Sequence, residues 1–389
     1  MPKSELSICV ITGSRSEYGL LRWILQEIKD DPALVLRLVV AGNHMSETWG
    51  RTIDEILADG FEPTDIIDVA LNTESGTTIA QSVAEILTHL TDVLGAHKPD
   101  LILVMGDRYE LLAVAAAAVI MTIPIAHISG GELTGGAIDE QIRHAMTKVS
   151  HIHFVANETY ARRVMQMGEE SWRVCISGEP GLDNVTRLEL WTAEKLGDFV
   201  SLDLSKPTAL VTYHPLTLEH ESLDQQIAIV IAAMEKSDLQ FVVTYPNADV
   251  GSEQIIQALE AFTGRNPGRA VLIKSLGQTR YLSALRHMTM MIGNSSSALF
   301  EAPSFNIPAV NIGTRQAGRM RAENVIDVAC DVDAILDGIK KAKAYDRSKV
   351  CVNPYGDGNS SGRVCEFIRS VFRERTRSEI LHKQFVDMT

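Results

Sequence analysis

The chain has 389 residues, which exceeds one ordinary domain and predicts two, each large enough to bury its own core. Hydrophobic residues make up 45% and charged residues 22%, as in globular proteins, and no apolar run could cross a bilayer. The formal net charge of -14 argues against nucleic-acid and anionic-membrane partners. No secretory leader pattern is present, which predicts a cytoplasmic protein. The five scattered cysteines indicate neither a disulfide framework nor a thiolate zinc site.

The first half of the chain alternates short apolar strands with amphipathic helices. Strands are predicted at 7–12, 36–40, 65–70, 101–105, 123–128, 151–156 and 173–178. Helices are predicted at 17–29, 46–57, 77–94, 109–121 and 140–149. This alternation predicts a doubly wound, mainly parallel sheet.

The alternation stops between about 184 and 206, where the sequence fits a linker, and then resumes. Further strands are predicted at 208–213, 240–245, 269–274, 288–293 and 307–313, and a last helix at 362–381. The sequence therefore predicts Rossmann-like domains at 1–185 and 206–360, followed by a C-terminal helical segment at 361–389.

Charged residues gather after two successive predicted strands of the first domain. The strand at 101–105 leads into Asp107 and Arg108, and the strand at 123–128 leads into a glycine-rich loop that carries Glu132. Ligands of open α/β sheets bind at the carboxyl ends of the strands, and paired carboxylates there suit acid–base chemistry. Asp139, at the end of the same loop, fits either such a role or the N-cap of the next helix.

Two other strand ends carry candidates whose local pattern is weaker. Arg15 lies in the loop GSRSEYG, where a helix start and a cation suit a phosphate, although a tight turn with a solvated arginine fits the loop alone better. This loop lacks the GxGxxG spacing of dinucleotide sites. His214 follows the strand at 208–213. A lone histidine is more often structural, but this position favours proton transfer.

The second domain carries the segment GNSSSALFE, in which small hydroxyl residues open a helix after a strand. Ser295 and Ser296 suit a diphosphate, and Glu301 suits the hydroxyls of a ribose, although serine caps are common at helix starts. Arg315 follows the next strand and adds a cation, which also fits a solvated helix charge. No P-loop or G-x-S-x-G motif is present.

Together, GSRSEYG, GDRYE, GGE, DEQIRHAMTK, YHP, PNAD, GNSSS and GTRQAGR resemble, in order and spacing, the hydrolysing UDP-N-acetylglucosamine 2-epimerases of sialic acid biosynthesis. The resemblance extends from the first strand to about residue 328. It implies a glycosyltransferase-B-like α/β fold of two Rossmann-like, doubly wound domains with an interdomain active-site cleft. It also implies that the second domain holds most of the nucleotide and that the last helix packs back on the first domain. A homodimer or homotetramer is expected, with a UDP-sugar as substrate and neither NAD nor a metal.

The resemblance also implies roles for individual residues. It implies catalytic roles for Asp107, Glu132, Asp139 and His214. It implies UDP-sugar binding by Arg15, Arg108, Asn247, Ser295, Ser296, Glu301 and Arg315. In the implied reaction, UDP leaves carbon 1 as carbon 2 loses its proton, and water and a proton then add to the 2-acetamidoglycal. Because carbon 2 is inverted, proton-transfer groups are needed on both faces of the ring, which explains several acids at one site.

The identity of the sugar is left open by the sequence. The resemblance favours UDP-N-acetylglucosamine, converted to N-acetylmannosamine for sialic acid and surface polysaccharide synthesis. Ser129 and the pair Glu179–Pro180 depart from the family pattern, so UDP-N,N'-diacetylbacillosamine, on the route to legionaminic acid, stays a candidate substrate. A non-hydrolysing epimerase, a glycosyltransferase and a non-catalytic UDP-sugar-binding module are competing interpretations. The glycosyltransferase interpretation leaves the three acids of the first domain without a joint purpose, and the presence of every matched acid argues against the binding module.

Overall fold

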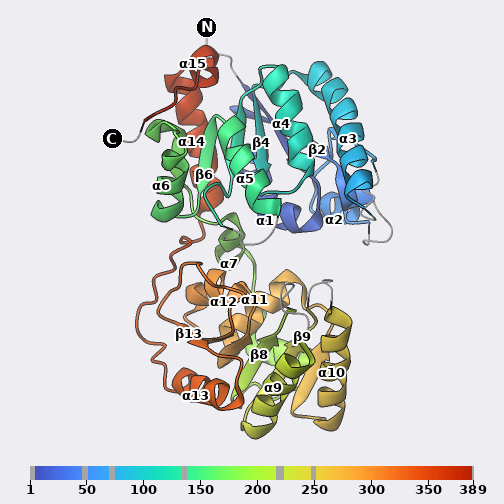
Figure 1. Cartoon of the computed structure of the whole chain (residues 1–389), viewed down its shortest axis with the longest axis vertical. Helices are drawn as coiled ribbons and strands as arrows, with labels where there is room; N and C mark the ends of the chain where they lie inside the picture. The colour runs from blue at the N-terminus through green and yellow to red at the C-terminus, as the bar shows by residue number, and fades with distance from the viewer. Residues whose placement is uncertain are drawn as a thin grey trace. The chain divides into compact units, whose positions relative to one another are not determined.

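The computed structural model describes residues 5–45, 51–69, 75–133, 138–215, 223–246 and 251–387. The chain divides into two compact units (Figure 1). The first unit comprises Met1–Asn184 and Tyr355–Thr389, and the second comprises Val185–Pro354. Each unit is built on one parallel sheet. Within the described ranges, no helix is long and apolar enough to span a membrane.

The sheet of the first unit has seven strands in the order β3-β2-β1-β4-β5-β6-β7. Their bounds are β1 (Leu6–Thr12), β2 (Leu34–Val40), β3 (Asp65–Ile66), β4 (Leu101–Met105), β5 (Ile125–Ile128), β6 (Ile152–Val155) and β7 (Val174–Ile176). All five residues of β4 and all four of β5 are buried, as expected for central strands that helices cover on both faces. The carboxyl ends of β1, β4 and β5 lie side by side because these strands are neighbours in a parallel sheet.

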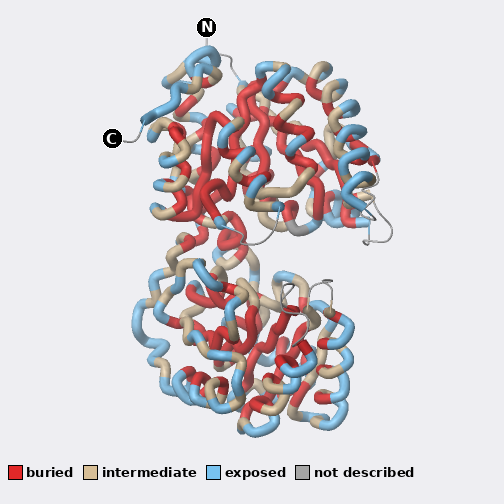
Figure 2. Tube along the Cα trace, viewed as in Figure 1, coloured by how far each residue is buried: buried red, intermediate tan, exposed pale blue. Residues whose placement is uncertain are grey.

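Helices cover both faces of this sheet. The helices of this unit are α1 (Arg15–Asp30), α2 (Ile53–Ala58), α3 (Gly76–His97), α4 (Glu110–Ile120), α5 (Ile138–Val149), α6 (Glu158–Gln166), α14 (Ser360–Glu374) and α15 (Arg377–Leu381). The short helix α7 (Asp183–Arg187) begins in the first unit and ends in the second. Single turns of 3-10 helix lie at η1 (Gly42–Met45), η3 (Ser171–Arg173) and η4 (Pro180–Leu182). One core cluster joins the sheet to α1, α2 and α14, and a second joins the opposite face to α3, α4 and α5. Figure 2 shows the strands of the seven-stranded sheet as the most continuously buried part of the unit.

The second unit repeats this plan with six strands in the order β10-β9-β8-β11-β12-β13. The strands are β8 (Thr208–Thr212), β9 (Gln240–Thr244), β10 (Ala270–Ile273), β11 (Met290–Gly293), β12 (Ala309–Ile312) and β13 (Val325–Val328). The helices are α8 (Ala193–Val200), α9 (Leu223–Lys236), α10 (Ser252–Arg265), α11 (Gly277–His287), α12 (Ser297–Phe300) and α13 (Val332–Lys343), with a 3-10 turn η6 (Ala302–Phe305). Because β8, β11 and β12 are adjacent, the loops that follow them start from neighbouring strand ends. These loops carry His214, Ser295 and Arg315.

The boundaries between the units differ from the predicted ones at two places. The segment expected to be a linker belongs to the second unit, where α8 lies against α11 and the Trp191 N–H donates to Ser283 Oγ at 2.9 Å. The residues from Tyr355 to 360 belong to the first unit rather than to the second. Tyr355 is fully buried there, and its carbonyl accepts from the Glu179 N–H at 2.7 Å.

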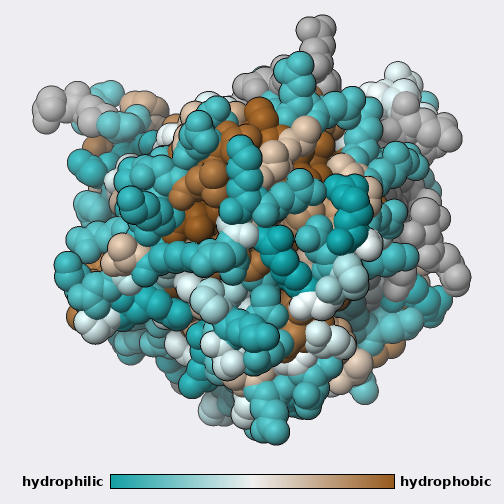
Figure 3. Space-filling model, turned by 90° about the horizontal axis from the view of Figure 1, so that it is seen from below, coloured by the Kyte–Doolittle hydropathy of each residue, from teal (hydrophilic) through white to brown (hydrophobic). Residues whose placement is uncertain are grey.

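The surface is largely polar, in keeping with the net charge of -14. Figure 3 shows one face on which hydrophilic residues predominate and hydrophobic residues gather mainly in its upper half, with smaller hydrophobic areas elsewhere. Exposed hydrophobic side chains also occur singly, as on most globular domains, and they give no indication of function by themselves.

Candidate active site

The turn after β4 places Asp107 at the carboxyl edge of the first sheet. Gly106 follows the buried strand with a φ of +85°, a left-handed conformation that glycine adopts readily. Its N–H donates to the Ile128 carbonyl of β5 at 3.1 Å. The chain therefore leaves the sheet in a sharp, fixed turn, and Asp107 is the next residue.

The loop after β5 brings Glu132 to the same edge. Ser129 and Gly131 both have positive φ values, +70° and +77°. A Cβ on Gly131 would lie 2.5 Å from the Tyr160 carbonyl oxygen, so only glycine fits this close approach of two backbones. The tight loop turns Glu132 inward, where it is 9% exposed.

Arg143 of α5 joins these two carboxylates. Its Nη1 donates to Glu132 Oε2 at 3.0 Å, and its Nη2 donates to Asp107 Oδ2. The Arg143 side chain is only 8% exposed, so both ion pairs are largely shielded from water. One guanidinium therefore holds acids from two different strands at one place.

Asp139 lies one helical turn before Arg143 on the same face of α5. The helix begins at Ile138, so Asp139 lies inside its first turn rather than at the capping position. Burial, and secondly the Asp107 carboxylate, raise the pKa of Asp139, whereas the Arg143 charge opposes this shift. Asp139 therefore holds its proton more readily than an ordinary aspartate does, and it lies near the two acids that Arg143 holds.

The two predicted phosphate-binding arginines of this unit pair with other carboxylates. Arg108 donates through Nε and Nη2 to Glu110 Oε1 at 3.0 and 2.7 Å, and not to Asp107. Arg15 pairs with Glu55 at 2.9 Å, and both side chains are well exposed. The structure therefore brings Asp107, Glu132 and Asp139 together around Arg143. It leaves Arg15 outside that cluster.

The second unit assembles its predicted residues through Asn294, which the sequence patterns did not single out. Gly293 precedes it with a φ of +139°, and a Cβ there would clash with the Thr212 carbonyl at 1.9 Å. The Asn294 amide accepts from the His214 N–H at 2.7 Å and donates to the His214 carbonyl at 2.8 Å. The Asn294 carbonyl accepts from Arg315 Nη1 at 3.2 Å. This one buried residue therefore fixes the loops after β8, β11 and β12 relative to one another.

Arg315 lies close enough to His214 to affect the pKa of the imidazole. His214 is 6% exposed. Burial, and secondly the Arg315 cation, lower the pKa of His214 to about 4. The imidazole is therefore neutral at pH 7, and it can accept or pass a proton without first losing one.

The serine segment follows β11, next to these loops. Ser295 Oγ accepts from the Ser297 N–H at 3.4 Å, and the Ser296 carbonyl accepts from the Leu299 N–H at 2.9 Å as α12 begins. Glu301 follows α12, and burial raises its pKa. The segment thus offers hydroxyl groups at a helix start and a carboxyl group one turn later. Asn247 lies outside the described residues.

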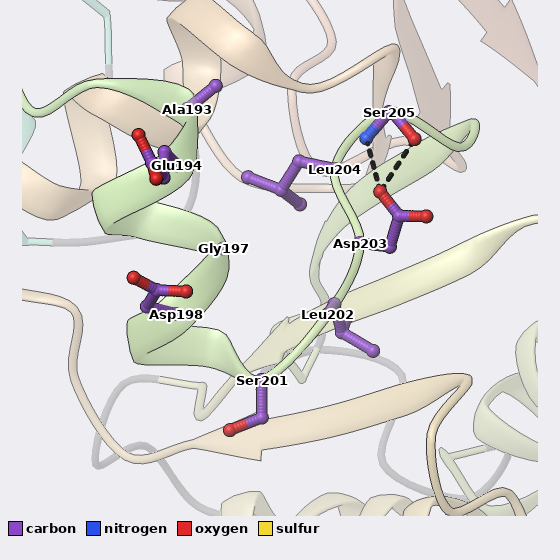
Figure 4. Close-up of a pocket in the computed structure, with 9 residues that line it drawn as sticks. All are labelled: Ala193, Glu194, Gly197, Asp198, Ser201, Leu202, Asp203, Leu204 and Ser205. Carbon is purple, nitrogen blue, oxygen red and sulfur yellow. Dashed lines mark hydrogen bonds between the residues drawn. The ribbon is translucent and has the colours of Figure 1, made fainter.

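Two other features of the described residues bear on the extent of the site: groups of side chains that could bind a metal ion, and a surface pocket in the second unit. Among the described residues, no group of three or more His, Cys, Asp or Glu side chains is placed to hold a metal ion. The pocket is lined by residues between Ala193 and Ser205, with Asp203 accepting from the Ser205 backbone and hydroxyl (Figure 4). None of the predicted site residues lines this pocket.

Comparison with known proteins identifies the family of this chain. The family model described as UDP-N-acetylglucosamine 2-epimerase matches residues 26–369, which is most of the chain. The chain belongs to this family. The predicted family resemblance is confirmed.

Several relatives match over nearly their whole length. The UDP-N,N'-diacetylbacillosamine 2-epimerase (hydrolyzing) of Legionella pneumophila is 36% identical over 97% of this chain and 98% of its own. The GDP/UDP-N,N'-diacetylbacillosamine 2-epimerase (hydrolyzing) of Campylobacter jejuni is 34% identical over 99% and 100%. The UDP-N-acetylglucosamine 2-epimerase of Neisseria meningitidis serogroup B is 30% identical over 98% and 99%.

Solved structures of this family share the fold. The crystal structure of UDP-GlcNAc 2-epimerase from Neisseria meningitidis bound to UDP-GlcNAc superposes with a TM-score of 0.78, at 19% identity, over 94% of this chain and 100% of that one. The predicted α/β, glycosyltransferase-B-like fold of two Rossmann-like units is thereby confirmed. The epimerase family is an enzyme family, so the interpretation as a binding module loses its support.

Proposed function

We propose that this epimerase is a hydrolysing one, which converts a UDP-2-acetamido sugar and water to the free 2-epimer and UDP. The observation that carries the proposal is the cluster in which Arg143 holds Asp107 and Glu132 beside Asp139. An inversion at carbon 2 requires one proton to leave and another to arrive from the opposite face, so it requires more than one acid–base group.

In the proposed reaction, a carboxylate takes the proton from carbon 2 as the bond from carbon 1 to UDP breaks, which gives a 2-acetamidoglycal and UDP. Water then adds at carbon 1, and a proton is delivered to carbon 2. We assign the proton transfers to Asp107 and Glu132, assisted by Asp139 and His214. Asp139 suits proton donation because burial and the Asp107 carboxylate raise its pKa above the ordinary aspartate value.

For UDP binding we propose the second-unit residues Ser295, Ser296, Glu301, Arg315 and Asn247, with Arg15 and Arg108 contributed by the first unit. Hydroxyl groups and backbone N–H groups at a helix start suit a diphosphate, and a guanidinium stabilises the charge that develops on the leaving UDP. Since Arg15 and Arg108 both pair with carboxylates in the free protein, binding would require them to exchange these partners for phosphate oxygens.

For the sugar, we propose UDP-N,N'-diacetylbacillosamine rather than UDP-N-acetylglucosamine, which the sequence alone favoured. The relatives at 36% and 34% identity are named for the diacetamido sugar, whereas the Neisseria relative at 30% is named for UDP-N-acetylglucosamine. The latter sugar is therefore the second candidate. Cytoplasmic location and a homodimeric or homotetrameric state remain predictions.

The experiment compares the two nucleotide sugars directly. Purified protein is mixed with each in turn, and the release of free UDP is followed to obtain kcat/KM. We expect the value for UDP-N,N'-diacetylbacillosamine to exceed that for UDP-N-acetylglucosamine at least about tenfold, since a site built to hydrogen-bond a group rejects the analogue that lacks it. The reverse ratio would establish the second candidate. Release of UDP from neither sugar would contradict the proposed function.

A further inference from the structure

A buried histidine contacts the turn that carries Asp107. His127 lies on β5 and is fully buried, and it is paired in register with Val104 of β4. Its Nε2 is 2.8 Å from the Gly106 carbonyl oxygen. Because a carbonyl oxygen only accepts hydrogen bonds, Nε2 carries the proton and the ring is in the Nε2–H form.

This hydrogen bond fixes the peptide group directly before Asp107. The Gly106 carbonyl and the Asp107 nitrogen belong to one planar peptide unit, so an anchored carbonyl sets the plane from which the Asp107 side chain departs. The N–H of Gly106 is anchored as well, by the Ile128 carbonyl at 3.1 Å. A left-handed glycine with φ +85° could otherwise adopt many conformations, so these two bonds define the turn.

We propose that His127 is a positioning residue, whose hydrogen bond to the Gly106 carbonyl aims the Asp107 carboxylate at the reacting carbon. The inference rests on the proposed role of Asp107 as a proton-transfer group. His127 itself touches no reacting atom in this mechanism.

The surroundings of the ring support a neutral donor. Burial lowers the pKa of His127 to about 4. His153 and Arg143 act in the same direction, whereas Asp107 and the Gly106 hydrogen bond oppose it. The other nitrogen, Nδ1, has no hydrogen-bond partner among the described residues. Burying a ring with one unpaired polar atom costs free energy that an apolar side chain of similar size would avoid. The hydrogen bond from Nε2 to the Gly106 carbonyl is therefore what a histidine provides at this position and an apolar side chain does not.

The chain offers a matched control in His153 of β6. His153 is also fully buried, it is paired in register with His127, and its Nδ1 likewise has no partner in the described part of the chain. Its Nε2 contacts Glu169 at 3.0 Å and not the Gly106 turn. Substitution of either ring perturbs the same layer of the core, but only His127 anchors the peptide before Asp107.

The test compares His127→Gln, which keeps a donor, with His127→Met, which has similar length and no donor. We expect H127M to lower kcat about 10²-fold with KM within about twofold of wild type, because a misplaced catalytic group costs rate rather than binding. H127Q is expected to recover most of the loss. H153M is expected to lower the melting temperature about as much as H127M while kcat stays within about twofold of wild type. Equal loss of kcat in H127M and H153M, or no recovery in H127Q, would overturn the proposal.

Two measurements need no turnover, so they separate this proposal from the proposed function. Nitrogen NMR of the wild-type protein should show His127 neutral with its proton on Nε2, and a proton on Nδ1 would contradict the proposal. Crystal structures of wild type and H127M should differ in the orientation of the Gly106–Asp107 peptide. An unchanged peptide would also contradict it, whether or not either UDP-sugar is turned over.

Discussion

The two units hold their predicted site residues by different kinds of contact. In the first unit, the contacts are ion pairs, with Arg143 between Asp107 and Glu132. In the second unit, the Asn294 side-chain amide binds backbone groups of another loop. Ion pairs thus fix the carboxylates of the first unit, whereas neutral amide contacts fix the backbone of the loops in the second. We expect these two kinds of contact to respond differently to substitution, in keeping with the proposed roles of the first unit in proton transfer and of the second in nucleotide binding.

The largest effect is expected from the acids of the first unit. Asp107→Asn and Glu132→Gln keep the shape of each side chain but remove its proton acceptor, so kcat should fall about 10²- to 10⁴-fold. UDP affinity, measured by titration calorimetry, should remain close to that of wild type. Wild-type turnover in both variants would show that the site has been assigned incorrectly.

Asp100→Asn provides the control for these variants. Asp100 is buried and precedes the same strand, β4, at its opposite end, where its Oδ2 accepts from the Ser7 N–H at 3.0 Å. Its loss should reduce stability and leave kcat unchanged.

Arg143→Met tests whether the ion pairs of the first unit are as strongly coupled as their burial suggests. Removal of the guanidinium leaves two largely buried carboxylates without their cation, which typically costs about 3–5 kcal/mol. The free energy of unfolding should therefore fall by an amount of that order in denaturant titration. The exposed Arg265–Glu235 pair of the second unit offers the contrast, and Arg265→Met should cost at most about 1 kcal/mol. Equal losses of unfolding free energy in the two variants would mean that the Arg143 ion pairs stabilise the fold no more than an exposed ion pair does.

Arg315→Gln addresses the second unit. The change removes a cation beside His214 and weakens the contact to the Asn294 carbonyl. A lost charged hydrogen bond to UDP should raise KM and the dissociation constant of UDP about tenfold, while kcat changes less than in Asp107→Asn. A large loss of kcat with unchanged UDP affinity would contradict the proposal that the second unit mainly binds the nucleotide.

A smaller effect is expected from pH on folding stability, and this effect should differ between the two units. Burial lowers the pKa of His44, His127 and His151 in the first unit, and of His214 in the second, from 6.5 to about 4. The unfolded chain then binds more protons between these values, so stability is present above pH 6.5 and is lost as the pH falls toward 4.

Glu17 of the first unit acts in the opposite direction to these histidines, which sharpens the measurement. Burial raises the pKa of Glu17 from 4.5 to about 7, so its contribution is present below pH 4.5 and is lost as the pH rises through 7. Hydrogen-exchange mass spectrometry between pH 4 and 8 should show the first unit losing more protection than the second on the acid side. Equal losses in both units would contradict the unequal distribution of these histidines.

Much of the fold could be predicted from the sequence, because central parallel strands are continuous apolar runs between helices. Predicted strands such as 101–105 and 208–213 correspond to β4 and β8. The edge strand β13 was missed, because none of its residues is fully buried and it gives little hydrophobic signal. At the other sheet, the strand expected at 65–70 shortens to the two residues of β3, which is also an edge strand.

The contacts within the site were harder to predict than its residues. Asp107, Glu132 and Asp139 stand out because carboxylates after apolar strands are conspicuous. Arg143 lies four residues after Asp139, a spacing that puts both on one helix face, yet its partners lie in the loops that follow β4 and β5. Arg108 is next to Asp107 in the sequence, whereas the structure pairs Arg108 with Glu110 and Asp107 with Arg143. Asn294 carries no charge, so nothing in the sequence showed that it connects three loops.

The most direct test of elimination at carbon 2 is proton NMR of the reaction in deuterated water. With UDP-N,N'-diacetylbacillosamine, the proposed mechanism predicts free UDP and a free 2-epimer that carries deuterium at carbon 2, because the proton removed there exchanges with solvent before another is delivered. Release of UDP with the original proton and configuration retained at carbon 2 would indicate simple hydrolysis at carbon 1. That result would contradict the proton-transfer roles of Asp107 and Glu132.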